Sequence, residues 1–215
     1  MTFNVNADLF RAAALIVSKE ETRYYLNGVC IEPCALGGVT LTATDGHRLF
    51  TAHDIEGEAS RIYIVKLDAT ALKACKVGRK ETSPRRVVLS GDDSYPVAVT
   101  DNHKTTTFNL ALNWEIKDAT FPDWRRVIPR HGSDDKSVID WYNPKYLATF
   151  AAVADILSDS DGTSIRICSK MVGAPALISF GNTNYSAVGV LMPRRGDESA
   201  IDFAPPFTEA PVSKQ

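Results

Sequence analysis

The stretch FNVNADLFRAAALIVS, residues 3–18, sets the pattern of the whole chain. Phe3–Asn6 alternates apolar and polar residues, which is typical of a short strand with one buried face. Asn6 can accept hydrogen bonds from the free N–H groups of a following first turn, and residues 7–18 place apolar side chains at helical spacing. The stretch therefore predicts a strand that runs directly into a capped helix.

The same strand-to-helix start occurs twice more along the chain. Ile62–Val65 leads into a helix capped by Asp68, and Val138–Trp141 leads into a helix that opens with Asn143 and Pro144. Three strand-like runs follow each helix, separated by pairs of Gly, Asp and Asn that favour turns. The expected strands are residues 24–32, 39–45 and 47–54, then 86–90, 96–101 and 105–112, then 164–169, 176–181 and 186–192.

This order predicts an α+β protein of three βαβββ units, in which helices cover one face of antiparallel sheets. Two units are expected to form a complete domain, residues 1–112, from units 1–60 and 61–112. Residues 113–137 form a connector, residues 138–195 a half domain, and residues 196–215 a flexible acidic tail.

The charge of the chain is unevenly distributed although the total is only −2. Residues 61–86 carry eight basic side chains against two acidic ones, whereas residues 1–60 carry four against eight. Such segregation can steer a polyanion, although a basic run is more often only a solvated face.

Several classes of protein are disfavoured by what the sequence lacks. The four cysteines show no C-x-x-C pair, no spacing with histidine fits a metal site, and no P-loop or G-x-S-x-G motif is present. We therefore expect no catalysis, no metal and no cofactor. The start of the chain does not read as a signal peptide and no apolar run reaches membrane-spanning length, so a cytoplasmic location in a bacterium or a phage-infected host, without membrane partners, is expected.

Four motifs carry a resemblance to a known family. The runs Arg23–Gly28, Ala43–Leu49, Phe121–Pro129 and Val190–Arg194 resemble, in family order, the bacterial DNA polymerase III β sliding clamp. The resemblance implies paired βαβββ units that close a six-domain ring, with helices lining a DNA channel and sheets outside. Residues 2–129 resemble the family's middle domain and residues 137–195 the second half of its last domain. One and a half clamp domains are therefore expected in a shortened, possibly phage-encoded clamp.

The resemblance also implies a pocket that receives a short hydrophobic peptide of polymerases and other replication proteins. Apolar side chains would form its floor, and Arg and His its rim. The matching positions are Leu26, Thr44, Gly46, His47, Arg48, Leu49, Pro122, Arg126, Val127, Val190, Leu191, Met192, Pro193 and Arg194.

A second set of residues is expected to contact double-stranded DNA. The resemblance points to Arg23, Tyr24 and Tyr25, since the matching loop of the family approaches DNA. The basic residues on or beside the first two helices add to this set, because phosphate contacts suit sliding better than base readout. They are Arg11, Lys19, Lys66, Lys73, Lys76, Arg79 and Lys80.

Counting units gives an expectation for the assembly. The family's ring holds twelve units, so three units per chain predict a homotetramer. A unit order of 1-2-3-3-2-1 repeated once around the ring, with unit three paired to unit three of another chain, leaves no unit without a partner. The alternative is a truncated clamp-like protein that binds or blocks a host clamp or its partners without encircling DNA.

Overall fold

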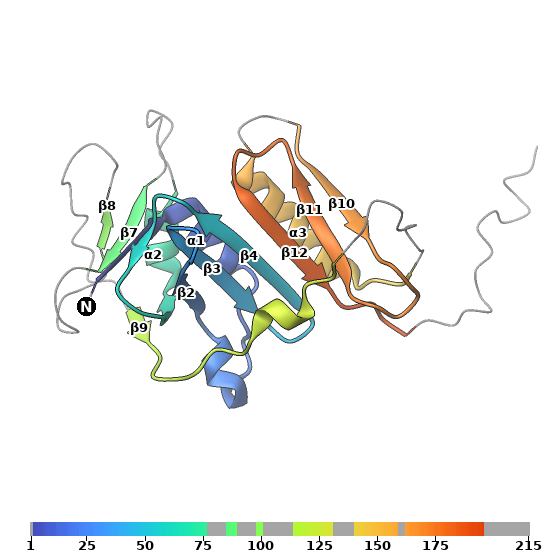
Figure 1. Ribbon diagram of the computed structural model, residues 1–215, viewed down its shortest axis with the longest axis horizontal. Coiled ribbons are helices and arrows are strands. Elements are labelled where there is room, and N and C mark those ends of the chain that lie inside the picture. Colours follow the sequence, from blue (N-terminus) through green and yellow to red (C-terminus); the bar gives the residue numbers. More distant parts are fainter. Residues whose placement is uncertain are drawn as a thin grey trace, which may run out of the picture.

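The computed structural model describes residues 2–76, 85–89, 98–100, 114–130, 140–158 and 162–195 (Figure 1). The first unit contains β1 (Phe3–Asn6), α1 (Ala7–Ala14), the 3-10 helix η1 (Glu21–Leu26), β2 (Val29–Pro33), β3 (Val39–Thr44) and β4 (Arg48–Asp54). β5 (Glu58–Ala59), β6 (Tyr63–Leu67), α2 (Ala69–Ala74), β7 (Arg86–Leu89) and β8 (Ala98–Thr100) follow. The connector carries β9 (Trp114–Ile116) and η2 (Trp124–Val127), and the third unit contains α3 (Pro144–Leu157), β10 (Ser164–Cys168), β11 (Ala176–Gly181) and β12 (Ser186–Leu191).

The expected α+β class with antiparallel sheets is confirmed. The expected strand at 105–112, residues 138–139 at the start of unit three, and the tail at 196–215 lie outside the described residues.

The three predicted helix starts are confirmed by their hydrogen bonds. The Asn6 side chain accepts from the backbone N–H groups of Asp8 and Leu9, at 2.9 and 3.1 Å. Asp68 accepts from Ala71 N–H at 2.7 Å, and Asn143 accepts from Lys145 N–H at 3.0 Å. Each cap satisfies donors that have no partner within the first turn.

One local prediction is wrong. The expected strand from residue 24 does not begin until Val29, because Glu21–Leu26 forms the 3-10 helix η1. The N–H of Asn27 donates to the carbonyl of Tyr24 at 3.2 Å and closes this helix. Tyr24 and Tyr25 therefore project from a helical turn and not from alternate faces of a strand.

The first two units exchange their opening strands. β1 leaves its own unit and pairs antiparallel with β7, with Val5 opposite Val87. β6 of the second unit pairs antiparallel with β2 of the first, with Cys30 opposite Ile64. Each unit thus supplies one strand to the sheet of the other, which produces a four-stranded sheet, β5-β1-β7-β8, and most of a longer one.

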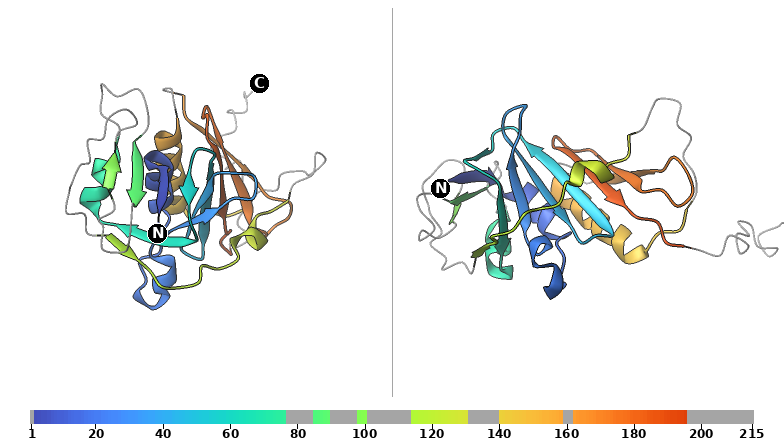
Figure 2. Two further views of the ribbon diagram at one scale, coloured as in Figure 1. Left: turned by 60° about the vertical axis from the view of Figure 1, so that its left-hand side comes forward. Right: turned by 60° about the horizontal axis from the view of Figure 1, so that its bottom comes forward.

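The longer sheet has eight strands in the order β10-β11-β12-β4-β3-β2-β6-β9. It continues from unit one to unit three because β12 pairs with β4 along six residues, from Ser186 opposite His53 to Leu191 opposite Arg48. Figures 1 and 2 show α1 and α3 against the same face of this sheet. Phe10 of α1 and Phe150 of α3 are fully buried in one shared core.

The β4–β12 pairing corrects the expected order of units. An order of 1-2-3 requires unit three beside unit two, whereas the long sheet places unit one between the other two. The order in space is therefore 2-1-3. The reason is that β4 is the outer strand of unit one and can extend its ladder, whereas β2, on the other side of unit one, is already paired with β6.

Gly189 gives a test of the packing between α3 and the joined sheet. A Cβ at this position would lie 2.4 Å from a ring carbon of Phe150, so Gly189→Ala forces the buried ring to move. Overpacking of this kind costs about 1–3 kcal/mol, and we expect that loss in urea unfolding. Ser186→Ala, an exposed position on the same strand, serves as the control. Equal stability of the two variants would contradict this packing.

Candidate functional site

The predicted partner pocket is centred on the junction of β4 and β12. Leu49 lies opposite Val190, and Arg48 lies opposite Leu191. The N–H of Met192 extends the ladder by donating to the carbonyl of His47 at 2.9 Å. Two of the four motifs, Ala43–Leu49 and Val190–Arg194, which lie far apart in the chain, are therefore joined by backbone hydrogen bonds between strands.

A tight turn before β4 fixes the polar rim of this junction. Asp45 accepts hydrogen bonds from the backbone N–H groups of His47 and Arg48, both at 3.0 Å, and Thr44 Oγ1 donates to the Arg48 carbonyl at 2.8 Å. Gly46 adopts a φ of 88°, in the left-handed region that favours glycine. These bonds orient the side chains of His47 and Arg48 toward unit three.

Tyr146 of α3 completes the rim from the other unit. The Arg48 guanidinium lies 4.7 Å from the centre of the Tyr146 ring, and the His47 ring stacks on the same ring at 6.0 Å. Arg48 also forms an ion pair with Asp45 at 2.9 Å and a hydrogen bond to Thr149. Cation–π contacts and a paired guanidinium both stabilise this arrangement.

Tyr146 and Thr149 were not among the predicted pocket residues. The sequence places them one helical turn apart on α3, which is consistent with a shared helix face. No local signal indicates that this face meets His47 and Arg48, about one hundred residues earlier in the chain, because only the β4–β12 pairing creates the contact.

The structure divides the predicted apolar floor into buried and exposed parts. Leu26, Leu49, Val190 and Leu191 are buried, and the last three lie in the paired strands of the junction. Met192 and Val127 are 40% and 46% exposed. Pro122, Arg126 and Arg194 are exposed, and Pro193 is half-buried.

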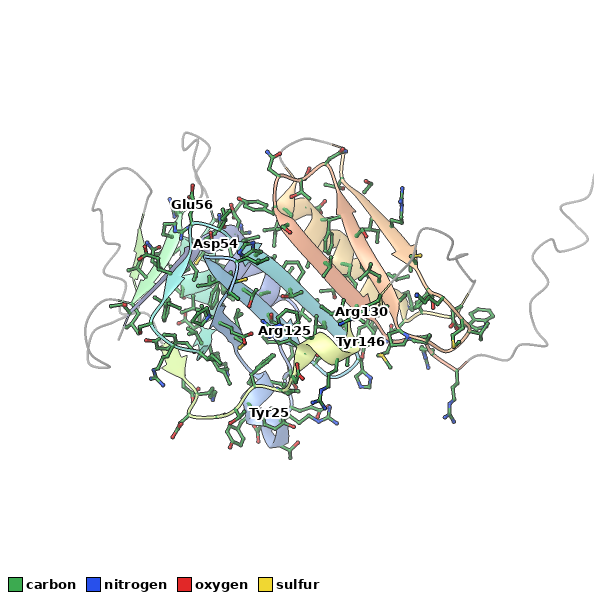
Figure 3. The ribbon with its side chains drawn as sticks, viewed as in Figure 1. Tyr25, Asp54, Glu56, Arg125, Arg130 and Tyr146 are labelled. Carbon is green, nitrogen blue, oxygen red and sulfur yellow. The ribbon has the colours of Figure 1, made fainter. Side chains whose placement is uncertain are left out.

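The connector approaches the junction from outside the sheet. Figures 1 and 2 draw the η2 segment beside the start of β4 and the end of β12, and Figure 3 labels Arg125 on this segment. Trp124 Nε1 and the Arg125 guanidinium both donate to Glu32, at 3.2 and 2.9 Å, which ties η2 to β2. Trp124 is thus an anchor of the connector.

The predicted DNA contacts are spread over several elements. Lys73 and Lys76 are exposed on and beside α2, while Arg11 on α1 is half-buried and paired with Asp8 at 2.8 Å. Lys19 follows α1 and is exposed. Lys145 on α3 is exposed as well, with exposed Asp155 near the other end of that helix. Arg79 and Lys80 lie outside the described residues.

η1 projects from the body of the molecule, and Figure 3 shows Tyr25 on it. Arg23 pairs with Glu20 at 3.3 Å, Tyr24 is 52% exposed, and Tyr25 is half-buried with its ring 5.9 Å from that of Tyr24. Arg23 also lies beside the turn before β4, since its guanidinium would be 2.7 Å from a Cβ on Gly46. This loop therefore links the two predicted surfaces.

Lys66 lies on β6 and not on a helix. Tyr63, Val65 and Leu67 of β6 belong to the core beneath the helices, so strand alternation directs Lys66 to the opposite face of the sheet. Lys66 nevertheless lines the cavity between α1 and β6 together with Lys19, and its contact with DNA stays a prediction.

Two cavities of about 390 and 380 Å³ lie away from the β4–β12 junction. The first is beneath the connector, against Cys30, Ile64 and Trp124. The second lies between α1 and β6, against Phe10, Leu67 and Leu72. Neither coincides with the predicted peptide pocket, of which only Pro122 lines the first.

The described residues contain no group of three His, Cys, Asp or Glu side chains placed to hold a metal ion. Within the same ranges, no helix is long and apolar enough to cross a membrane.

The four cysteines are free thiols in different environments. Burial raises the pKa of both the Cys30 and the Cys75 thiols to about 12, so both stay protonated and unreactive near neutral pH. We expect iodoacetamide at about pH 8 to modify Cys34 and Cys168, which are only half-buried, well before the other two. Peptide mass spectrometry checks the order, and denaturant should make all four react alike; equal rates in the folded protein would contradict it.

Comparison with known proteins places this geometry in a family context. No protein-family model matches the chain. The beta sliding clamp of Caulobacter vibrioides is 32% identical over 148 residues, which is 66% of this chain and 37% of the relative. That of Haemophilus influenzae is 27% identical over 164 residues, 75% of this chain and 41% of the relative. The chain is a relative of the bacterial beta sliding clamps.

Solved structures agree on the fold. A sliding clamp from Bartonella birtlesii, bound to griselimycin, superposes with a TM-score of 0.60 and 19% identity, over 91% of this chain and 66% of that one. A sliding clamp from Pseudomonas aeruginosa gives a TM-score of 0.59 and 16% identity, again over 91% and 66%. The predicted resemblance and the sliding-clamp fold are therefore confirmed. The chain spans less than half the length of the curated sliding clamps that it matches.

Proposed function

We propose that the protein is a DNA sliding clamp, a non-enzymatic processivity factor that encircles duplex DNA as a ring of several copies. The observation that carries the proposal is the β4–β12 junction, which assembles residues of two distant motifs beside Tyr146 in a chain related to beta sliding clamps. A homotetramer remains the expected assembly by unit counting, now with the unit order 2-1-3 in each chain.

The partner site is proposed to be the surface around Met192, Val127, His47, Arg48 and Arg194. Exposed methionine and valine offer an adaptable apolar contact, and the two arginines offer a polar rim. A short hydrophobic peptide of a DNA polymerase or another replication protein is the proposed ligand. Griselimycin is bound to the Bartonella clamp, so its binding to this chain, and its competition with such a peptide, can be tested as well.

The DNA-facing surface is proposed to be the helix side with η1. Lys73, Lys76, Lys19 and Arg11 supply positive charge near duplex phosphates, and Arg23 with Tyr24 and Tyr25 supply contacts from the loop. Contacts of this type weaken steeply as salt increases, so they permit sliding but do not by themselves retain the protein on DNA.

Binding by phosphate contacts and retention by encirclement can be told apart by their sensitivity to salt. Duplex DNA is tethered by one end to a bead, the protein is added, and the other end is then blocked by a bulky protein or left open. A ring threaded onto the duplex should survive a wash at about 0.5 M salt only when the end is blocked, because phosphate contacts are largely lost there. Release from both DNAs would contradict encirclement under these conditions.

Charge variants separate encirclement from simple adhesion. Lys73→Glu with Lys76→Glu should weaken low-salt binding to DNA with open ends by about tenfold or more, since each phosphate contact contributes to the salt-dependent affinity. Asp155→Lys on α3, which adds charge to the helix side, should not weaken it. If both variants lose the same amount of DNA affinity, the basic residues of α2 do not contact DNA. If the protein binds a host clamp but is not retained on end-blocked DNA, the alternative is supported, namely a truncated clamp-like protein that does not encircle DNA.

A further inference from the structure

β10 ends the long sheet without a second neighbour among the described residues. It pairs with β11 alone, from Ser164 opposite Gly181 to Cys168 opposite Leu177. Its counterpart in the first unit is β2, which is also the first strand after a helix. β2 pairs on both sides, with β3 and with β6. Figure 1 shows β10 at the outer edge of the sheet.

The difference in pairing is matched by a difference in burial. Val29, Cys30 and Ile31 of β2 are all at most 2% exposed. In β10, Ile165 and Ile167 are only half-buried and Arg166 is exposed. An edge strand also presents N–H and C=O groups that can pair with another strand. Within the part of the chain that the structure describes, β10 therefore has an unpaired backbone edge and apolar side chains that are incompletely covered.

Units one and two show how such an edge is covered. In each unit, the strand before the helix cap pairs with the first strand after the helix of the other unit. β1 of unit one pairs with β7 of unit two, and β6 of unit two pairs with β2 of unit one. In unit three the residues before the Asn143 cap are Asp140, Trp141 and Tyr142. Among the described residues their one strand-type contact is the isolated bridge of Trp141 with Arg194, and the Asp140 carboxylate accepts the Gly173 N–H at 2.7 Å. Trp141 itself is 46% exposed.

We propose that unit three is completed by unit three of a second copy of this chain, through reciprocal strand exchange. Asp140–Tyr142 of each copy lies antiparallel to β10 of the other, as β1 lies to β7 and β6 to β2. The contact is isologous, since both copies contribute the same two segments about a two-fold axis. Trp141 covers apolar surface at the partner's edge, while the Asp140 carboxylate keeps its bonds to the Trp141 and Gly173 N–H groups of its own chain.

The consequence for assembly is specific. Two chains joined in this way present the unit order 2-1-3-3-1-2, which contains three complete clamp-like domains. The contact between two copies follows from the fold of unit three alone, whereas the closure of two such pairs into a ring rests on the proposed function. An experiment can therefore refute the contact or the ring independently of the other.

Hydrogen exchange tests the contact in the unaltered chain. Amides of residues 164–168 should exchange at least tenfold more slowly in concentrated than in dilute protein, because pairing protects them only when a second copy is bound. Amides of residues 29–33 should be equally protected at both concentrations, since β2 is paired within one chain. An unchanged rate for residues 164–168 across the dissociation range, measured by light scattering, would overturn the proposal.

A variant gives the second test. Trp141→Asp should halve the native mass measured by light scattering, relative to a wild-type value of two or four times the 23.5 kDa chain. Leu36→Asp is the matched control, because Leu36 is 86% exposed at the β2–β3 turn and lies far from β10 in the sheet order. A folded Trp141→Asp protein of unchanged mass, or a monomeric wild type, would refute the exchange. If Trp141→Asp does not fold, the exchange rates of the wild type decide. If residues 164–168 are protected at high concentration but the protein is not retained on end-blocked DNA, the contact between copies is supported and the proposed ring is refuted.

Discussion

Asp54→Ala is expected to lower the free energy of unfolding by about 3–5 kcal/mol, the largest effect of any single substitution proposed for this chain. Asp54, at the end of β4, and Arg86, at the start of β7, form an ion pair at 3.2 Å with side chains only 6% and 8% exposed. Asp54 also accepts the backbone N–H of Asn6 at 2.6 Å. The carboxylate thus links the long sheet to both β1 and β7 of the short sheet.

The physical reason for the large effect is the charge left behind. Arg86 donates further hydrogen bonds to the Asn4 side chain at 2.8 Å and to the Glu56 carbonyl at 3.1 Å, so it cannot simply turn to solvent. Figure 3 shows where Asp54 and Glu56 lie. Removing only the carboxylate buries an unpaired guanidinium.

Urea unfolding measures the effect, and two variants control it. Glu58→Ala, at an exposed position on β5, should change stability by no more than about 0.5 kcal/mol. Asp54→Ala combined with Arg86→Met should be more stable than Asp54→Ala alone, because no unpaired charge remains buried. A single variant as stable as the wild type would show that this pair does not connect the sheets.

Arg48→Ala is expected to weaken binding of a hydrophobic clamp-binding peptide by about thirtyfold, which corresponds to roughly 2 kcal/mol. The Arg48 side chain is only 13% exposed and is held by Asp45, Tyr146 and Thr149. It is therefore rigid before any partner arrives, and a pre-organised arginine loses little conformational entropy on binding. Fluorescence anisotropy of a labelled peptide measures the change.

Two other arginines near the junction provide matched comparisons. Arg126→Ala removes a rim side chain that is 83% exposed and should cost only a few-fold in affinity. Arg125→Ala removes the partner of Glu32 outside the predicted pocket and should leave affinity unchanged. Urea unfolding of each variant separates lost binding from a weakened junction. Full affinity in a folded Arg48→Ala protein would place the partner site elsewhere.

Features governed by neighbouring residues could be predicted from the sequence. The helix starts at Asn6, Asp68 and Asn143 follow from short-range hydrogen bonds, and the strands β3, β4 and β10–β12 follow from alternation between turn residues. η1 was missed because the run from Tyr24 to Leu26 has strand-like composition, whereas its backbone closes a local 3-10 turn. Local propensity is a weak guide when two short-range options compete.

Long-range pairing could not be predicted in the same way. The exchange of β1 and β6, the joining of unit one to unit three, and the contacts of Arg48 with Tyr146 and Thr149 all depend on which strand edges remain open after folding. Alternation shows that a strand has a buried face but not which strand lies beside it. The sequence by itself thus determined the repeated units and the residue types of the partner surface. Only the tertiary structure decided the 2-1-3 order, the buried pair of Asp54 and Arg86, and the open edge of β10, because each results from hydrogen bonding and burial between residues far apart in the chain.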